Sequence, residues 1–170
     1  MVYEPRDDSF LLFNHIKSYT QGKKVLDMGT GSGIQAVEAS RYAHKVLGVD
    51  IDLKAVEHCK IKYDFEVVHS DLFNNIHGAF DVIMFNPPYL PNAPYGALDT
   101  DGGLQGFETI IKFLREARHH LTMNGVVLIV VSSHSNQPLV EAEMRNLGYR
   151  YRIIEEKHMF FEKLFLYEIQ

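Results

Sequence analysis

Four consecutive residues combine hydrogen-bond acceptors, a rigid backbone and an aromatic face: Asn86-Pro87-Pro88-Tyr89. Prolines cannot donate to a strand ladder, so the apolar strand before them ends at Phe85 and leaves Asn86 at its carboxyl end. The Asn86 side-chain oxygen and the Pro87 carbonyl can accept both hydrogens of one NH2 group. Tyr89 offers a flat face on which a planar group can stack. The motif predicts a pocket for a planar amide or amino nitrogen, with Asn86, Pro87 and Tyr89 as candidate catalytic residues. A loop with a packing tyrosine is the alternative.

A glycine-rich turn lies upstream, where residues 25–33 read Val-Leu-Asp-Met-Gly-Thr-Gly-Ser-Gly. Gly29, Gly31 and Gly33 fall between a predicted strand and a predicted helix, where glycines allow a tight turn and a close approach of the backbone to a ligand. Asp50, at the end of the next predicted strand, can hold a ribose hydroxyl. Because the segment also fits the G-x-G-x-x-A dinucleotide pattern, this turn alone is typical of both NAD enzymes and S-adenosylmethionine enzymes.

Three further side chains favour S-adenosylmethionine over NAD. Asp27 lies beside the turn, where its carboxylate repels a pyrophosphate but attracts the ammonium of a methionyl group. Asp71 follows the third predicted strand, where it can accept a hydrogen bond from the exocyclic amine of adenine; a helix cap or turn residue is the alternative. Asn86 follows the fourth strand. All three motifs therefore lie at the carboxyl ends of neighbouring strands, where open α/β sheets bind ligands.

Strand-like and helix-like patterns alternate along the chain, which predicts a single α/β domain over residues 1–170. The predicted strands are Lys24–Met28, Lys45–Asp50, Phe65–Val68, Phe80–Phe85 and Val126–Val131, and the predicted helices are Ser9–Tyr19, Ile34–Tyr42, Leu53–Tyr63, Phe107–Leu121 and Pro138–Leu147. Two alternating segments, Tyr149–Glu155 and Lys163–Glu168, predict an antiparallel hairpin at the end of the sheet. Residues 89–104 are rich in proline and glycine and predict a long loop of the kind that often has a function.

The composition limits the classes of protein to consider. The chain of 170 residues has a net charge of −5, which argues against strong binding to nucleic acid, because such binding relies on neutralising phosphates. Its polar, acidic start is unlike a signal peptide, no apolar run is long enough to span a membrane, and the single cysteine, Cys59, suits a reducing compartment. The nine histidines lack the spacing of metal ligands. We therefore expect a cytoplasmic protein without a metal site or a membrane partner.

These motifs give the chain a resemblance to a known family. The glycine turn with Asp27 resembles that of class I S-adenosylmethionine-dependent methyltransferases, and the Asn-Pro-Pro-Tyr motif resembles that of members which methylate amide or exocyclic amino nitrogens. Segments 2–12 and 102–106 resemble eukaryotic and archaeal HemK-like glutamine methyltransferases. The resemblance implies one Rossmann-like domain with a seven-stranded, mostly parallel sheet in the order 3-2-1-4-5-7-6, an antiparallel last strand and helices on both faces.

The resemblance also implies an activity. A methyl group would pass from S-adenosylmethionine to the glutamine side chain in the Gly-Gly-Gln loop of a class 1 translation release factor, leaving S-adenosylhomocysteine. The residues that it implies for cofactor binding are Ser9, Asp27, Gly29, Gly31, Gly33, Asp50, Asp71, Leu72 and Asn86. Three alternatives remain open: another methyl acceptor, such as a nucleic-acid amino group or a protein lysine; an NAD-dependent oxidoreductase; and a non-catalytic subunit with the same fold.

The resemblance further implies a partner, a small zinc-binding protein that activates several methyltransferases. The implied strand order places Phe65–Val68 at an open edge of the sheet, where Glu66 is the one charge on a short apolar strand. Ile61 and Tyr63 add apolar surface from the preceding helix. Since exposed edges pair with other chains, we expect a heterodimer through this edge, and we expect a lysine at Val67 to disrupt it. Covering of the edge by the protein's own loop is the alternative.

Overall fold

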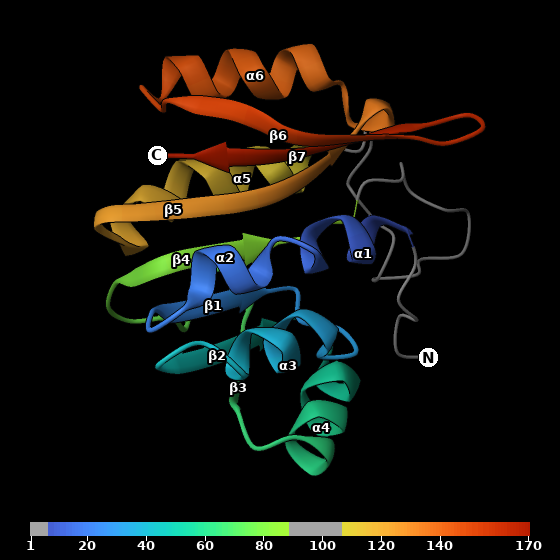
Figure 1. Cartoon of the computed structure of the whole chain (residues 1–170). Helices are drawn as coiled ribbons and strands as arrows, with labels where there is room; N and C mark the ends of the chain where they lie inside the picture. Colours follow the sequence, from blue (N-terminus) through green and yellow to red (C-terminus); the bar gives the residue numbers. More distant parts are fainter. Residues whose placement is uncertain (1–6, 89–106) are drawn as a thin grey trace.

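The computed structural model describes residues 7–88 and 107–170, which build one sheet with helices on both faces (Figure 1). The strands are β1 Lys24–Met28, β2 Lys45–Asp50, β3 Glu66–His69, β4 Phe80–Phe85, β5 Leu121–Ser132, β6 Tyr151–His158 and β7 Lys163–Ile169. Their order in the sheet is β3-β2-β1-β4-β5-β7-β6. Strands β1 to β5 pair in parallel with one another, while β7 is antiparallel to both β5 and β6. This topology confirms the Rossmann-like, seven-stranded sheet that the sequence predicts.

Two layers of helices bury the two faces of the sheet. The helices are α1 Asp7–Phe13, α2 Ile16–Thr20, α3 Ile34–Ser40, α4 Leu53–Lys62, α5 Glu108–Ala117 and α6 Gln137–Asn146. One core joins α1, α2 and α3 to residues such as Val25 of β1, and the other joins α5 and α6 to residues such as Leu26. Successive strand residues point to opposite faces, so both need apolar side chains, which explains the continuous apolar runs. None of the helices in the described ranges is long and apolar enough to cross a membrane.

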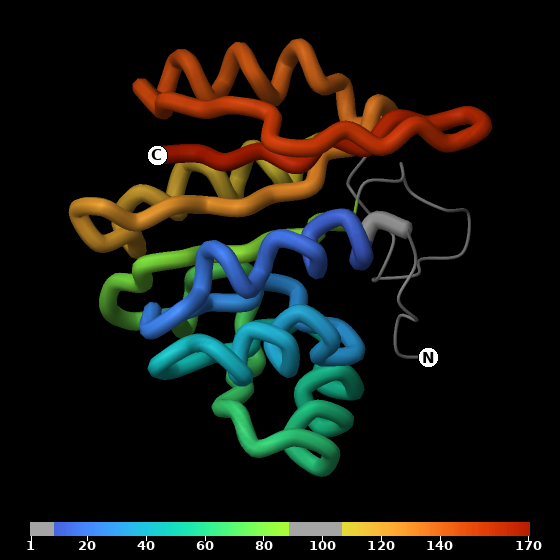
Figure 2. The backbone as a smooth tube through the Cα atoms, in the orientation of Figure 1, coloured from blue at the N-terminus to red at the C-terminus, as the bar shows by residue number. Residues whose placement is uncertain are grey.

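The parallel strands end together at one edge of the sheet. Met28 of β1 is in register with Val49 of β2 and with Phe85 of β4, and Phe85 is in register with Ile129 of β5. Figure 2 traces the chain as it turns at this edge after β1 and after β2. The glycine turn, the end of β2 and the end of β4 therefore meet at one place, as the sequence predicts.

The first predicted helix is not continuous in the structure. Residues Ser9–Tyr19 belong to two helices, α1 and α2, separated by a turn in which His15 N donates to Leu12 O at 3.0 Å. This turn brings His15 Nε2 to 2.5 Å from Glu155 Oε2 on β6. The pairing depends on the last hairpin of the chain, so the tertiary contact overrides what local apolar spacing indicates.

The start of β5 also differs from the prediction. The helix predicted to reach Leu121 is α-helical to Ala117 and continues as a 3-10 helix over Arg118–His120, and β5 begins at Leu121 rather than at Val126. Thr122 Oγ1 donates to Asp81 Oδ1 at 3.0 Å, which holds this polar beginning of β5 beside β4. Polar residues can extend a strand when a neighbouring strand supplies partners, and a pattern of apolar residues does not detect this.

Candidate active site

The glycine turn between β1 and α3 requires glycine for two reasons. Gly29, Gly31 and Gly33 all have positive φ, of 64°, 52° and 83°. A Cβ at Gly33 would lie 2.7 Å from the Tyr63 ring, so no larger residue fits without displacing that ring. A Cβ at Gly29 would lie 3.4 Å from the ring of Phe85. The turn thus lies directly against the last residue of β4, which immediately precedes Asn86.

Asp50 connects the end of β2 to the glycine turn. Its Oδ2 accepts a hydrogen bond from Gly31 N at 2.8 Å, and its Oδ1 accepts one from Asp52 N at 2.8 Å. Burial raises the pKa of this carboxyl group, although these backbone hydrogen bonds oppose the shift. Each carboxylate oxygen accepts more than one hydrogen bond, so Asp50 keeps capacity for ribose hydroxyls. Sequence reasoning placed Asp50 at this edge but did not show that it also shapes the turn.

Asp27 lies beneath the same turn and is almost completely buried, with 2% of its surface exposed. Its Oδ2 accepts a hydrogen bond from Thr30 Oγ1 at 2.7 Å. Burial raises the pKa of Asp27 to about 7, and the negative charge of Asp50 adds to the rise, while hydrogen bonds from Thr30 and the Ala36 backbone oppose it. Near neutral pH this carboxyl group therefore exchanges readily between its neutral and its charged form.

Two acids beside one turn determine which ligand fits it. Asp27 and Asp50 attract a cation and repel an anion such as pyrophosphate. S-adenosylmethionine carries an ammonium, a sulfonium and a ribose, so its charges match these two carboxylates better than those of a dinucleotide do. The structure thus supplies a distinction that the glycine pattern alone does not give.

Asp71 and Leu72 follow β3 at the same edge of the sheet. Asp71 Oδ2 accepts a hydrogen bond from Lys112 Nζ of α5 at 2.8 Å, and both side chains are about half exposed. Leu72 has an unusual positive φ of 47°, and its side chain is buried in the core beside α5. Lys112 is a neighbour of the predicted site that the sequence did not indicate. A solvent-exposed ion pair of this kind is weak, so Asp71 can be released to another partner.

Ser9 is buried next to the helix that follows the glycine turn. Its carbonyl oxygen accepts a hydrogen bond from Gln35 Nε2 at 2.7 Å, which ties α1 to the first turn of α3. Gln35 is also buried, and sequence reasoning did not single it out. The sequence did contain one indication of its role, because Gln35 is a polar residue on the apolar face of a short helix.

Asn86 and Pro87 follow the central strand β4, which pairs with β1 on one side and β5 on the other. Asn86 is half-buried and Pro87 is buried. Phe85 anchors the end of β4 in the core, because the centroid of its ring lies 4.5 Å from that of Phe113 on α5. Tyr89 falls outside the described residues, as do the predicted loop 89–104 and segment 102–106.

The end of β5, the strand next to β4, leads into a compact polar turn. Ser132 Oγ accepts a hydrogen bond from His134 N at 3.0 Å, and the His134 ring is exposed. His134 therefore belongs to a serine-capped turn. Over residues 7–88 and 107–170, no three His, Cys, Asp or Glu side chains are grouped so that they could hold a metal ion.

The sheet order, the glycine turn and the acids at its carboxyl edge define a class I methyltransferase domain of the Rossmann-like type. Comparison with known proteins agrees, because the family model described as "Methyltransferase small domain" matches residues 7–161. The chain belongs to this methyltransferase family, and its HemK-like type, predicted from the sequence, is confirmed by its relatives.

Several relatives carry more specific names. A putative protein N5-glutamine methyltransferase of Methanocaldococcus jannaschii is 36% identical over 175 residues, covering 96% of this chain and 88% of the relative. A release factor glutamine methyltransferase of Rhodopirellula baltica is 34% identical over 64% of this chain, which spans only 44% of that relative. Among solved structures, the E. cuniculi Mtq2-Trm112 complex, described as responsible for methylation of the eRF1 termination factor, matches with a TM-score of 0.85 and 25% identity. The match covers 99% of this chain and 98% of that chain.

Proposed function

We propose that this protein transfers a methyl group from S-adenosylmethionine to the side-chain nitrogen of a glutamine, and that the glutamine lies in the Gly-Gly-Gln loop of a class 1 release factor. The observation that carries the proposal is the contact between the glycine turn and the end of β4. Since a Cβ at Gly29 would lie only 3.4 Å from Phe85, a ligand on the turn is adjacent to Asn86. The names of the archaeal, bacterial and E. cuniculi relatives support the acceptor and the substrate.

Each polar group at this edge of the sheet binds a different part of the cofactor. Asp50 accepts hydrogen bonds from the ribose hydroxyls, and Asp71 accepts one from the adenine amine once Lys112 has released it. The glycine turn surrounds the methionyl part, whose ammonium is drawn by Asp27 below the turn. Ser9 and Leu72 complete the cofactor site through their positions beside α3 and after β3.

Orientation and desolvation are the main contributions of the protein to the reaction. The bound cofactor supplies a methyl group that its sulfonium already activates. An amide nitrogen is a poor nucleophile because its lone pair is delocalised, so it must be aligned with that methyl group. The Asn86 side-chain oxygen and the Pro87 carbonyl accept its two N–H bonds and favour the positive charge that develops on the nitrogen. Tyr89 stacks on the planar amide in this proposal.

A transfer assay tests the proposed substrate directly. The protein is incubated with methyl-labelled S-adenosylmethionine and either a wild-type release factor or one whose Gly-Gly-Gln glutamine is replaced by asparagine. We expect label in the first factor and none in the second, because asparagine places its amide one methylene short of the methyl group. Equal labelling of both factors would rule out this glutamine as the acceptor.

A ribosomal RNA base is the second candidate acceptor. The observation in its favour is a ribosomal RNA small subunit methyltransferase C of Cronobacter sakazakii, which is 32% identical over 78% of this chain, although the chain spans only 37% of that relative. An RNA amino nitrogen also presents two N–H bonds to the Asn86 and Pro87 acceptors. The same assay with ribosomal RNA in place of the release factor distinguishes the two.

We also propose that a small zinc-binding activator protein binds at the β3 edge, since the E. cuniculi structure is a complex of two proteins. The edge strand is Glu66–His69, one residue later than predicted. Val67 packs inward against Val56 and Cys59, so a lysine there would disturb the core as well as the edge. Ile61 of α4 is 89% exposed and is the better probe.

Co-purification tests this edge. We expect Ile61→Lys to weaken recovery of the activator at least tenfold and to leave the melting temperature of the lone chain unchanged, because the side chain makes little contact with the fold. Met123→Lys serves as the matched control, since Met123 is just as exposed but lies at the start of β5. Equal recovery with both variants would exclude the β3 edge as the binding surface.

A further inference from the structure

The tip of the β6–β7 hairpin presents two adjacent phenylalanine rings to solvent. Phe160 is 91% exposed and Phe161 is 83% exposed, and their rings meet edge to face at 4.5 Å. Tight turns usually contain glycine, asparagine, aspartate or serine, because these residues suit the backbone and are well solvated. Two exposed aromatic rings contribute nothing to the core, and leaving them in water is unfavourable. The tip therefore has the composition of an interaction surface.

Hydrogen bonds hold the base of this tip in a fixed position. Met159 N donates to Glu162 O at 2.8 Å, which closes the turn. Ser132 Oγ donates to Glu162 Oε1 at 2.5 Å, and Lys163 N donates to Ser133 Oγ at 3.0 Å. The tip is thus tied to the polar turn at the end of β5, the strand beside Asn86.

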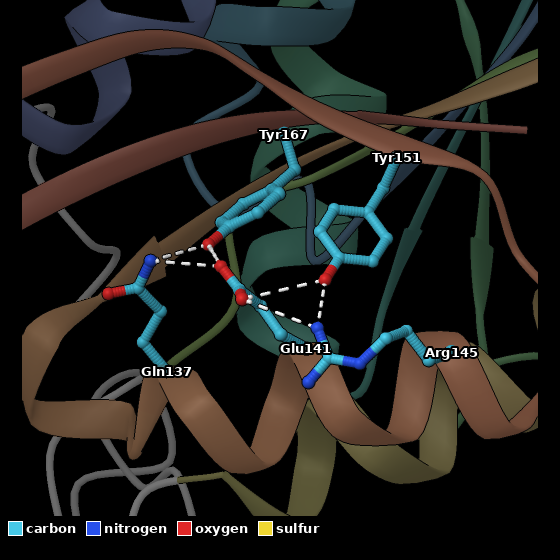
Figure 3. Close-up of polar contacts among 5 residues, drawn as sticks. All are labelled: Gln137, Glu141, Arg145, Tyr151 and Tyr167. Atoms are coloured by element: carbon cyan, nitrogen blue, oxygen red, sulfur yellow. Dashed lines mark hydrogen bonds and ion pairs between the residues drawn. The ribbon is translucent and has the colours of Figure 1, made fainter.

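A second set of contacts secures the body of the hairpin against α6. Figure 3 shows Tyr151 and Tyr167 of the two strands pointing toward side chains of α6. The Tyr167 hydroxyl donates to Glu141 Oε1 at 2.6 Å and accepts a hydrogen bond from Gln137 Nε2 at 2.6 Å, while Arg145 Nη1 donates to the Tyr151 hydroxyl. Burial and the neighbouring Glu141 raise the pKa of Tyr167, so this phenol remains a donor. A surface on such a support binds with little loss of conformational entropy.

The tip lies on the same side of the sheet as the candidate active site. Ser132 at the carboxyl end of β5 pairs with Leu164 of β7, so residues 159–162 lie beyond the end of β5. Phe85, directly before Asn86, is in register with Ile129 of that same strand. Figure 1 shows the hairpin projecting past the ends of the neighbouring strands. A macromolecule that reaches Asn86 from this edge therefore passes close to the tip.

Charge indicates what kind of partner the tip fits. The hairpin end carries Glu155, Glu156 and Glu162 against Lys157 and Lys163, and the whole chain has a net charge of −5. Such a surface lacks the excess of cations that the phosphates of nucleic acid and of anionic lipid require. Apolar aromatic anchors inside a polar rim are typical of contacts between proteins, where a few such side chains dominate the binding energy.

We propose that Phe160 and Phe161 anchor the folded domain of the protein substrate, inserting into an apolar depression on it while its acceptor loop reaches Asn86. This proposal rests on the proposed function, because it assumes an acceptor carried by a protein. The substrate surface that it requires is an apolar depression with a neutral or basic rim, complementary to the glutamates of the hairpin. Activity on the release factor would then depend on residues that take no part in the methyl transfer itself.

Steady-state kinetics on intact release factor tests the tip. The variant is Phe160→Ser/Phe161→Ser, and the control is Met123→Ser, which removes a side chain that is 96% exposed at the start of β5. For the double variant we expect the KM for release factor to rise at least tenfold, with kcat within twofold of the wild type and unchanged affinity for S-adenosylmethionine. The control should match the wild type in all three quantities.

Three results would overturn the proposal in distinguishable ways. If the wild type labels the release factor and the double variant does so with the same KM, the tip is not a docking site. If the wild type sediments as a dimer that the double variant abolishes, the rings serve self-association instead. Failure of the wild type to label any release factor contradicts the proposed function itself, and the tip proposal fails with it.

Discussion

The two halves of the sheet hold their functional groups in different ways. In the half formed by β1, β2 and β3, backbone groups fix the side chains: Asp50 accepts from Gly31 N and Asp52 N, and Asp27 lies buried beneath the turn. In the half formed by β4 to β7, side chains hold one another in place, as Tyr167 and Glu141 do. This half also exposes the rings of Phe160 and Phe161 to solvent.

This difference has a physical meaning. A cofactor is the same molecule in every turnover, so a site built from backbone hydrogen bonds and buried charge can be fixed in advance. A macromolecular substrate must be selected and released, which suits exposed anchors and side chains at the rim. We therefore expect substitutions in the first half to change stability and cofactor affinity, and those in the second to change turnover and substrate affinity.

The largest expected effect concerns Asp27 and the stability of the first half. Its raised pKa, about 7, means that the neutral form stabilises the fold; this contribution is present below the unfolded pKa near 4 and is lost as the pH rises through about 7. A rise of about three pKa units corresponds to about 4 kcal/mol. Asp27→Asn should therefore be more stable than the wild type at pH 8 by a large part of that amount, and similar to it at pH 4.

Urea unfolding of the cofactor-free protein at pH 4 and pH 8 measures this effect. Asp81→Asn is the control, since hydrogen bonds from Lys24 N and Thr122 lower the pKa of Asp81, so its contribution is lost only as the pH falls below about 4 and the stability of this variant relative to the wild type should not change at higher pH. Identical pH dependence of the wild type and Asp27→Asn would show that folding does not raise the pKa of Asp27.

The next effect separates chemistry from binding in the second half. We expect Asn86→Ala to lower kcat by at least two orders of magnitude, about 3 kcal/mol for a positioned polar group, and to leave the affinity for S-adenosylmethionine nearly intact. Asn124→Ala, at the exposed start of β5, should change neither. Single-turnover rates with saturating cofactor provide the measurement, and a wild-type rate would remove Asn86 from the mechanism.

A smaller effect is expected for Asp50 in the first half. Asp50→Ala removes a charged acceptor of ribose hydroxyls and the hydrogen bond to Gly31 N, which suggests a loss of about 1.5–3 kcal/mol in cofactor binding. Asp52→Ala is the control, because Asp52 only caps α4 by accepting from Lys54 N at 2.9 Å. The control should lower stability by about 1 kcal/mol and leave affinity unchanged. Equal affinities of all three proteins in titration calorimetry would contradict the role of Asp50.

The smallest effect on cofactor affinity is expected for Lys112 of α5, which pairs with Asp71 in the first half. Lys112→Met frees Asp71 from an exposed ion pair worth about 0–1 kcal/mol, so cofactor affinity should rise slightly, by less than about fivefold. Cofactor titrations at low and high salt check this, since salt weakens the competing pair only in the wild type. A tenfold loss of affinity would instead show that Lys112 itself contacts the ligand.

The sequence predicts the strand ends well because each motif is joined to an apolar run. Such a run directly precedes Gly29, Asp50 and Asn86, so parallel pairing alone brings these residues to one edge. The partners of these residues are a different matter. Ser9 with Gln35, Asp71 with Lys112, and His15 with Glu155 are pairs of residues far apart in the chain. Their choice depends on how the helices pack on the sheet, which local periodicity does not encode.

The position of the methyl group on the substrate tests the central claim most directly. Release factor treated with the wild-type protein and S-adenosylmethionine is digested, and tandem mass spectrometry locates the added mass. We predict a single methyl group on the glutamine side chain of the Gly-Gly-Gln sequence, absent when Asn86→Ala replaces the wild type. A methyl group on a lysine or on another residue, or an equal yield from both proteins, would contradict an amide-directed site at the end of β4.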